Sequence, residues 1–185
     1  MKKLLALLCL VAALPAYAID CGNMGEWLGS GCQRIADTYE QGSPDLYLSG
    51  YAWHDPNTYT DEKLDELNSK AWGLGFGKHV TDADGNQDIV YGMIFSDSHK
   101  DPQINVGYGR IWYWNVVGPM SAGLGYTVGL VSRQDIYGGI PFPIALPLVS
   151  IKADRVSLMG TFIPKLGGGL NHGNVAFFFG RVELQ

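Results

Sequence analysis

The side chains between residues 120 and 130 alternate between two kinds, and this alternation constrains the fold more than any other feature of the chain. The even positions from Met120 to Leu130 are all apolar, whereas the odd positions hold only serine, threonine and glycine. The segment from Trp72 to Lys78 repeats the pattern, with glycine at every second position. A period of two residues is the period of a β-strand and not of a helix. The chain is therefore expected to form strands with one apolar face and one face of small side chains.

Eight segments of this kind follow one another, each of roughly ten residues, the length of a tilted strand that crosses a bilayer. Short turns alternate with longer loops between them, and Asp82 to Asn86 has the Asp-Gly sequence of a hairpin turn. This predicts an all-β fold, an eight-stranded antiparallel outer-membrane β-barrel. The expected strands are 45–53, 71–80, 88–96, 105–114, 120–131, 141–150, 156–163 and 174–184, and the longer loops are 54–70, 97–104, 132–140 and 164–173.

A face of glycines inside a strand needs a physical reason, because glycine weakens a strand. One interpretation is that the space beside the glycines stays open for a ligand inside the barrel. The alternative is close packing around a narrow barrel interior.

The N-terminus has the layout of a secretory signal peptide. Lys2 and Lys3 precede an apolar run from Leu4 to Leu14, and Ala16-Tyr17-Ala18 follows as a cleavage site. We expect residues 1–18 to be the signal and 19–185 to be one barrel domain. No later run has the length and apolarity of a membrane-spanning helix, so the barrel is the structure expected to span the membrane.

The net charge of the chain and the spacing of its histidines argue against nucleic acid and metal ions as ligands. The formal net charge is −5 and the sequence pI is about 5.2, without a basic patch interleaved with aromatic residues. Nucleic acid is therefore not an expected partner. The four histidines and the carboxylates show no metal-ligand spacing, so we expect no metal and no cofactor.

The segment 19–44 is expected to contain a short amphipathic helix at the membrane interface. Leu28, Cys32, Ile35 and Tyr39 recur at helical spacing, with charged residues between them. Cys21 and Cys32 are the two thiols of the exported chain, and either a disulfide or two free cysteines fits the sequence.

Two segments that are distant in the sequence are expected to meet at the outer rim of the barrel. The first strand rises to His54, and the third rises to Asp97 and Ser98. Histidine can act as a base, serine as an activated hydroxyl or a donor, and aspartate as an orienting carboxylate. Because neighbouring residues of a strand point opposite ways, Asp97 and Ser98 can both approach His54 only if the chain bends there. Ordinary polar loop residues are the alternative interpretation.

An ordered set of motifs spans nearly the whole mature chain and resembles the lipid A palmitoyltransferase family, PagP. The motifs are Asp45-Leu46-Tyr47, Tyr51-Ala52-Trp53-His54, Trp72-Gly73-Leu74-Gly75-Phe76-Gly77, Asp97-Ser98, Gly107-Tyr108-Gly109, Pro141-Phe142-Pro143 with Leu146-Pro147-Leu148, Ile163-Pro164 and Gly173-Asn174-Val175.

The resemblance implies an outer-membrane acyltransferase that moves a palmitoyl chain from a glycerophospholipid donor to a lipid A acceptor. It further implies that His54, Asp97 and Ser98 are the catalytic residues, at the extracellular rim. Gly109, with Gly107 on the same strand face, would border the acyl chain at the floor of its pocket. Pro143 or Pro147 and Pro164 resemble prolines that open a lateral gap between strands, through which lipid could enter. The protein is expected to be a membrane-embedded monomer.

Three other functions stay open at this point: palmitoylation of phosphatidylglycerol, deacylation of lipid A, and a small outer-membrane barrel without catalysis. His99 stands where the family pattern suggests an aromatic residue, and it is either a second titrating group or a loop residue. Asp55, directly after His54, is another carboxylate that could partner the histidine.

Overall fold

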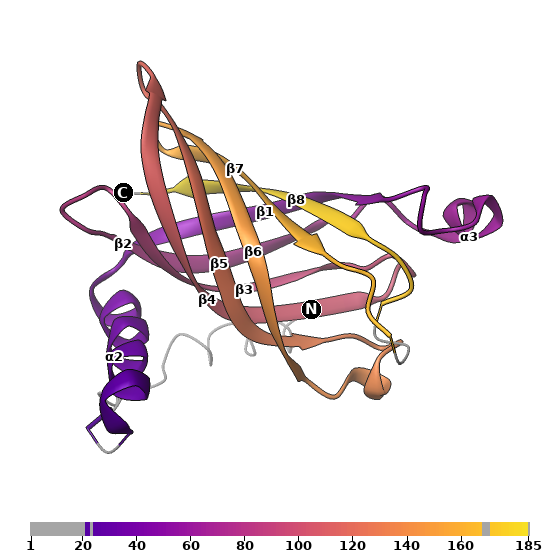
Figure 1. Cartoon of the computed structure of the whole chain (residues 1–185), viewed down its shortest axis with the longest axis horizontal. Helices are drawn as coiled ribbons and strands as arrows, with labels where there is room; N and C mark the ends of the chain where they lie inside the picture. Colours follow the sequence, from indigo (N-terminus) through magenta and orange to yellow (C-terminus); the bar gives the residue numbers. More distant parts are fainter. Residues whose placement is uncertain (1–20, 23, 168–170, 185) are drawn as a thin grey trace, which may run out of the picture.

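The chain folds into a closed barrel of eight antiparallel strands. The computed structural model describes residues 21, 22, 24–167 and 171–184, so the expected signal peptide lies outside the described residues. Each strand pairs with its neighbour in the sequence, and β1 also pairs with β8 to close the barrel (Figure 1). The predicted architecture is confirmed. The strands are β1 (Ser43–His54), β2 (Gly73–Thr81), β3 (Gln87–Ser96), β4 (Pro102–Val117), β5 (Met120–Ser132), β6 (Phe142–Ala153), β7 (Val156–Ile163) and β8 (Val175–Glu183).

The two faces predicted by the alternation are the outer and inner faces of the barrel wall. Large apolar side chains are exposed on the outside along every strand, among them Leu48, Leu74, Phe76, Ile94, Trp112, Leu124, Val149, Leu158 and Phe178. A continuous apolar outer wall is the surface that a bilayer requires of a barrel. The interior is filled by a buried cluster that is largely aromatic and aliphatic, including Tyr47, Phe95, Ile111, Met159, Phe177 and Phe179.

Much of the glycine-rich inner face is closely packed. A Cβ atom built on Gly77 would lie 2.9 Å from the Tyr47 ring, and one on Gly123 would lie 2.7 Å from the Ile111 side chain. Real Cβ atoms do not approach other atoms so closely, so only glycine leaves room for these neighbours. For these two glycines the structure supports close packing around a narrow interior.

The connections divide the barrel into two ends. Three tight connections, at 82–86, 118–119 and 154–155, form the turn end, and the predicted Asp-Gly turn is confirmed by Gly85 at a φ of 85°. The segments 55–72, 97–101, 133–141 and 164–174 form the loop end. Two short helices of the loop end, α3 (Asp61–Glu66) and the 3-10 helix Tyr137–Gly139, were not predicted.

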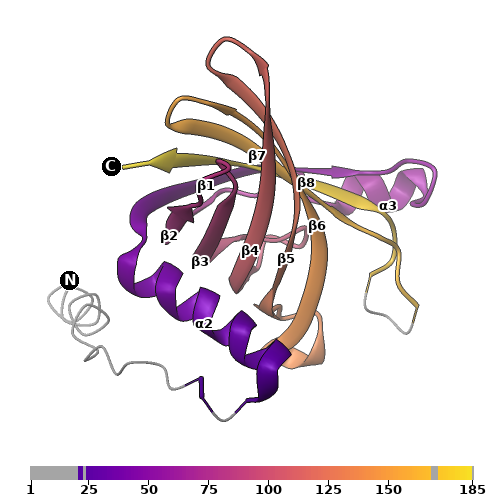
Figure 2. The ribbon, with the colours of Figure 1, turned by 60° about the vertical axis from the view of Figure 1, so that its left-hand side comes forward.

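The predicted N-terminal helix is α2 (Gly25–Gln41), and it lies across the outside of the barrel next to β2 and β3 (Figure 2). Lys78 on β2 donates a hydrogen bond to the Tyr39 carbonyl at 2.6 Å and its ammonium lies 5.4 Å from the Tyr39 ring centroid. Cys21 and Cys32 form a disulfide, which decides between the two possibilities that the sequence left open. Among the described helices, none is long and apolar enough to cross a membrane.

Buried charged and polar groups close the barrel interior near the turn end. Arg181 is fully buried, donates to Glu183 at 2.7 Å and also donates to Gln87. His79 and Asp45 lie beside them, with 2.8 Å between His79 Nδ1 and Asp45 Oδ1. Because these groups pair with one another, the interior can carry charges at this end without exposing them to the apolar centre. Open interior space is therefore found toward the loop end.

Candidate active site

A cavity of about 270 Å³ lies inside the barrel at the loop end. Its walls are mostly apolar, and its polar lining residues include groups from the loop segments 97–101 and 133–141. Such a space can hold an apolar chain with a reactive polar group at the mouth. The lining includes Ala52, Phe95, Val131, Ile144, Leu146, Ile163 and Phe177 on the apolar side, and Asp97, Ser98, His99, Arg133 and Asp135 on the polar side.

His54 and Ser98 meet as the topology predicts. His54 is the last residue of β1, Ser98 follows the end of β3, and His54 Nε2 lies 2.8 Å from Ser98 Oγ. His54 is only 6% exposed, and its ring makes an edge contact with Tyr59 at 5.6 Å between centroids. Burial raises the pKa of the Tyr59 hydroxyl. A neutral imidazole can accept the serine proton only through the nitrogen that carries no hydrogen, so Nε2 must be the acceptor for Ser98 to be activated.

Asp97 holds the turn that carries Ser98 and is not hydrogen-bonded to His54. Its Oδ1 atom accepts from the backbone N–H groups of His99, at 2.7 Å, and Asp101, at 2.9 Å. The Asp97 N–H donates to the Asp101 carbonyl at 2.8 Å, and Lys100 has a φ of 71°. The chain therefore bends at 97–101, as the sequence required for Ser98 to reach His54. Of the three side chains expected to meet, His54 and Ser98 form a hydrogen-bonded pair. The Asp97 carboxylate instead binds the backbone of the turn.

Asn68 fastens this turn to the loop that follows β1, and sequence reasoning did not find it. Its backbone N–H donates to the Ser98 carbonyl at 2.8 Å, and its side-chain amide donates to the Asp97 carbonyl at 3.1 Å. These bonds hold two consecutive carbonyl groups, those of Asp97 and Ser98. Asparagine in a polar loop carries no sequence signal for such a role.

Asp55 belongs to the loop and does not orient His54. Its carboxylate accepts from the Asn57 backbone N–H at 2.9 Å and from the Asn174 side chain at 3.1 Å. The Asn57 hydrogen bond and then that of Asn174 hold the pKa of Asp55 below its usual value. Within the described part of the chain, the other ring nitrogen of His54, Nδ1, has no hydrogen-bond partner.

The hydrogen-bond ladder between β6 and β7 stops before the loop end of the barrel. The ladder between these strands runs from Ala153 and Val156 to Leu148 and Thr161 and stops there. Residues 142–147 of β6 pair with β5 on one side. On the other side, they have no ladder partner among the described residues of β7. Pro143 and Pro147 lie in this stretch and Pro164 directly follows β7, so these prolines stand where the ladder ends, and a lateral gap between the strands stays a prediction.

Gly107 and Gly109 lie deeper in the barrel than the cavity described above. On β4 the cavity is lined by Gln103 and Asn105, and the two glycines follow on the same inner face toward the turn end. A Cβ atom on Gly109 would lie 3.1 Å from the side chains of Ile89 and Leu148. The role of both glycines in holding an acyl chain stays a prediction.

One group of side chains in the described structure has the composition of a metal site. Ligand-type atoms of Asp97, His99 and Asp135 all lie within 4.8 Å of one another. Sequence spacing gave no indication of this group, because Asp135 comes from a different loop.

Comparison with known proteins identifies the family. Residues 34–181 match the family model described as "Antimicrobial peptide resistance and lipid A acylation protein PagP". The chain is 41% identical over 179 residues to the lipid A acyltransferase PagP of Bordetella parapertussis, with 97% of each chain covered. It is 38% identical over 190 residues to the protein of that name from Legionella pneumophila, with 100% of each covered. The matched span contains His54, Asp97 and Ser98. With its motifs, its barrel and these relatives in agreement, the chain belongs to the PagP family of lipid A acylation proteins.

Proposed function

We propose that this protein, exported and embedded in the outer membrane as a monomer, transfers a palmitoyl chain from a glycerophospholipid to lipid A. Family membership makes it a lipid A acyltransferase. The donor, the chain length and the residues that perform the transfer are the further content of the proposal. The observation that carries it is the 2.8 Å contact between His54 Nε2 and Ser98 Oγ, beside an apolar cavity that Ser98 lines.

In the proposed reaction the donor's acyl chain occupies the cavity and its ester lies at the mouth. A lipid A hydroxyl attacks the ester carbonyl, the new ester bond forms, and the bond to the glycerol oxygen breaks. The attacking hydroxyl loses its proton to His54, and the departing oxygen of the lysophospholipid takes a proton from the same imidazole. If Ser98 attacks first and forms an acyl-serine, His54 carries the proton in both half-reactions.

The unpaired stretch between β6 and β7 would be the opening through which the lipid enters. A phospholipid or a lipid A molecule that lies in the bilayer can extend its acyl chain through the barrel wall without leaving the apolar phase. The loop end then faces the outer leaflet, where lipid A resides, and the turn end faces the periplasm. This orientation also places α2 at the periplasmic side of the membrane.

Mass spectrometry of lipid A tests the proposal. Cells that lack a native palmitoyltransferase would express either the wild-type protein or the Ser98→Ala variant, with matched amounts of inserted barrel. A gain of one palmitoyl group in the first strain and not in the second is expected. Loss of an acyl chain would indicate a deacylase, and palmitoyl gain confined to phosphatidylglycerol would indicate the phospholipid acceptor. Unchanged lipids in both strains would indicate an outer-membrane barrel without catalytic activity.

A further inference from the structure

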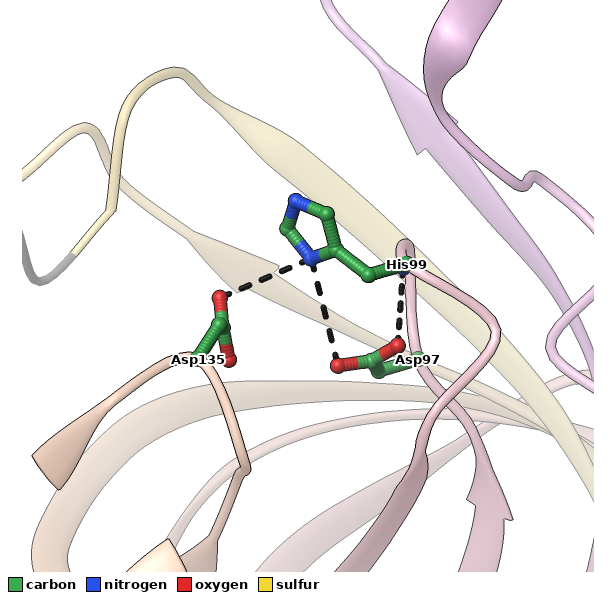
Figure 3. Close-up of side chains that lie close together, drawn as sticks. All are labelled: Asp97, His99 and Asp135. Carbon is green, nitrogen blue, oxygen red and sulfur yellow. Dashed lines mark hydrogen bonds and ion pairs between the residues drawn. The ribbon is translucent and has the colours of Figure 1, made fainter. Parts of the chain in front are cut away.

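Three side chains from two separate loops converge at the mouth of the cavity (Figure 3). Asp97 and His99 belong to the turn after β3, whereas Asp135 belongs to the loop after β5. His99 Nδ1 lies 3.5 Å from Asp135 Oδ2 and 4.0 Å from Asp97 Oδ2. The imidazole nitrogen therefore faces one oxygen of each carboxylate, and the three atoms surround a common point.

Asp97 provides an independent indication that this position suits a positively charged ligand. Its side chain is 2% exposed, and its Oδ2 atom has no hydrogen-bond partner in the described structure. Its other oxygen, Oδ1, accepts two backbone hydrogen bonds and is satisfied. A buried carboxylate oxygen without a partner is costly, and such oxygens normally accept a hydrogen bond or bind a cation. The unpartnered oxygen is the one directed toward His99.

We infer that Asp97, His99 and Asp135 bind a single divalent cation of the zinc class. One imidazole nitrogen and two carboxylate oxygens are ligands that suit Zn²⁺. At a metal-ligand distance of about 2 Å, tetrahedral ligand atoms lie roughly 3.3 Å apart, so the distances from His99 Nδ1 to the two carboxylates, 3.5 Å and 4.0 Å, need to contract by less than about 1 Å. Calcium and magnesium are disfavoured, because they take six or more oxygen ligands and rarely use a histidine nitrogen.

Arg133 is the local competitor for the cation. Its guanidinium pairs with Asp135 through contacts of 2.9 Å and 2.6 Å. Burial raises the pKa of Asp135, but the hydrogen bond and charge of Arg133 outweigh burial and lower it overall. Of the two carboxylates, only Asp135 is paired with Arg133 in the described structure, so the charge of Asp97 stays available for a metal. Each carboxylate oxygen has a second lone pair, so Asp135 can bind the metal while Arg133 holds it in place.

An ion at this site would join the two loops that flank the cavity mouth. Three protein ligands leave the fourth position of a tetrahedral ion open. A water molecule or a phosphate oxygen of a lipid could occupy that position. The site differs from the His54–Ser98 pair in its residues, although Asp97 lies directly before Ser98 in the chain.

Metal binding can be measured without reference to acyl transfer. The tag-free wild-type protein, refolded in detergent and stripped of metal, would be titrated with Zn²⁺ by calorimetry and with Co²⁺ by visible absorption. One ion per barrel is expected, with micromolar affinity and a cobalt spectrum of tetrahedral type. The His99→Asn and Asp135→Asn variants should each weaken binding by more than about a hundredfold, which exceeds the roughly 10–100-fold loss caused by altering an outer-shell contact.

Two further variants make the test specific. His172→Asn changes a histidine of the loop end that is outside the group, and it should bind Zn²⁺ as the wild type does. Arg133→Gln removes the competing charge and should tighten binding. Heat-dependent migration of the barrel on gels verifies that each variant is folded. Absence of Zn²⁺ binding by the folded wild type at millimolar metal would overturn the inference, as would unchanged affinity in both His99→Asn and Asp135→Asn.

Discussion

His54 Nε2 lies 2.8 Å from Ser98 Oγ, although the two residues come from different strand ends and are 44 positions apart in the sequence. The contact requires β1 and β3 to end on the same side of the barrel. Replacement of His54 by glutamine keeps a hydrogen-bonding group of similar reach but removes the base. We expect the turnover number for acyl transfer to fall roughly a hundredfold to ten-thousandfold, the usual contribution of a general base.

That loss should be measured on purified barrels in detergent with a radiolabelled phospholipid donor. The donor affinity should change little, because the apolar cavity is untouched. Equal turnover by His54→Gln and the wild type would contradict the assignment of the base.

Asp97 is expected to act by positioning Ser98 and not by charge on His54. Asp97→Asn retains an oxygen that can accept from the His99 and Asp101 N–H groups, whereas Asp97→Ala loses both hydrogen bonds, each worth about 1.5–3 kcal/mol with a charged acceptor. Asn should therefore retain a substantially larger share of the turnover than Ala. Amide hydrogen exchange in residues 98–101 should be accelerated in the Ala variant only. If Asn and Ala lose activity equally while exchange is unchanged in both, the negative charge itself is required.

The barrel could be predicted from the sequence because strand alternation is a local property. The exposed Leu124 and the inward Gly123, for example, are distinguished by their position in a period-two pattern. Helix α3 could not be predicted in this way. It has six residues without a buried side chain, and its one local signal is the Thr60 hydroxyl, which accepts from the Lys63 N–H at 3.4 Å.

The candidate site was predicted as far as strand topology determines it. His54 and Ser98 stand at strand ends, so the direction of each strand was enough to bring them together. Asn68 and Asp135 reach the site through the conformation of long loops, which no periodicity describes. The volume of open space beside the glycines could not be predicted from the sequence either, because it depends on side chains from other strands, such as Tyr47.

Gly109 is predicted to set the preferred acyl length. A methionine there would displace Ile89 and Leu148, whose side chains already lie 3.1 Å from the position of a Cβ atom, and would shorten the space available below the cavity. Gly109→Met should therefore prefer shorter acyl donors, with overpacking that costs about 1–3 kcal/mol of stability. Competition between donors of different chain length, followed by mass spectrometry of the product, measures the preference.

Gly92→Met is the matched control for that experiment. A Cβ atom at Gly92 would meet only Val106, at 3.7 Å, on the outer wall of the barrel. The control variant should keep the wild-type chain-length preference. The prediction is wrong if Gly109→Met also keeps it.

Closing the opening between β6 and β7 should block lipid entry. Extending the observed register by one residue places Pro147 opposite Phe162, so a Pro147→Cys, Phe162→Cys protein can be crosslinked across the edge of the gap. The oxidised form should lose most of its acyl transfer and regain it on reduction. A control pair, Ile151→Cys with Leu158→Cys, joins residues that are already ladder partners and should be insensitive to oxidation.

Reduction also opens the native disulfide between Cys21 and Cys32, so the two double variants must be compared in the same reductant. Full activity of the gap-crosslinked protein, with crosslinking verified by mass spectrometry, would show that lipid does not enter between these strands.

Arg181 is predicted to be the most destabilising of the buried charges to remove. It is fully buried and donates to Glu183 and Gln87, and its Nη1 atom lies 4.0 Å from Asp45. Arg181→Met would leave the carboxylates of Asp45 and Glu183 buried without the guanidinium, at a cost of about 3–5 kcal/mol. Urea unfolding in detergent should show a lower midpoint with a similar slope. Arg155→Met, which changes an exposed arginine in the turn between β6 and β7, should unfold as the wild type does. An unchanged midpoint for Arg181→Met would mean that Lys152, 2.5 Å from Glu183, is sufficient to balance the buried carboxylates.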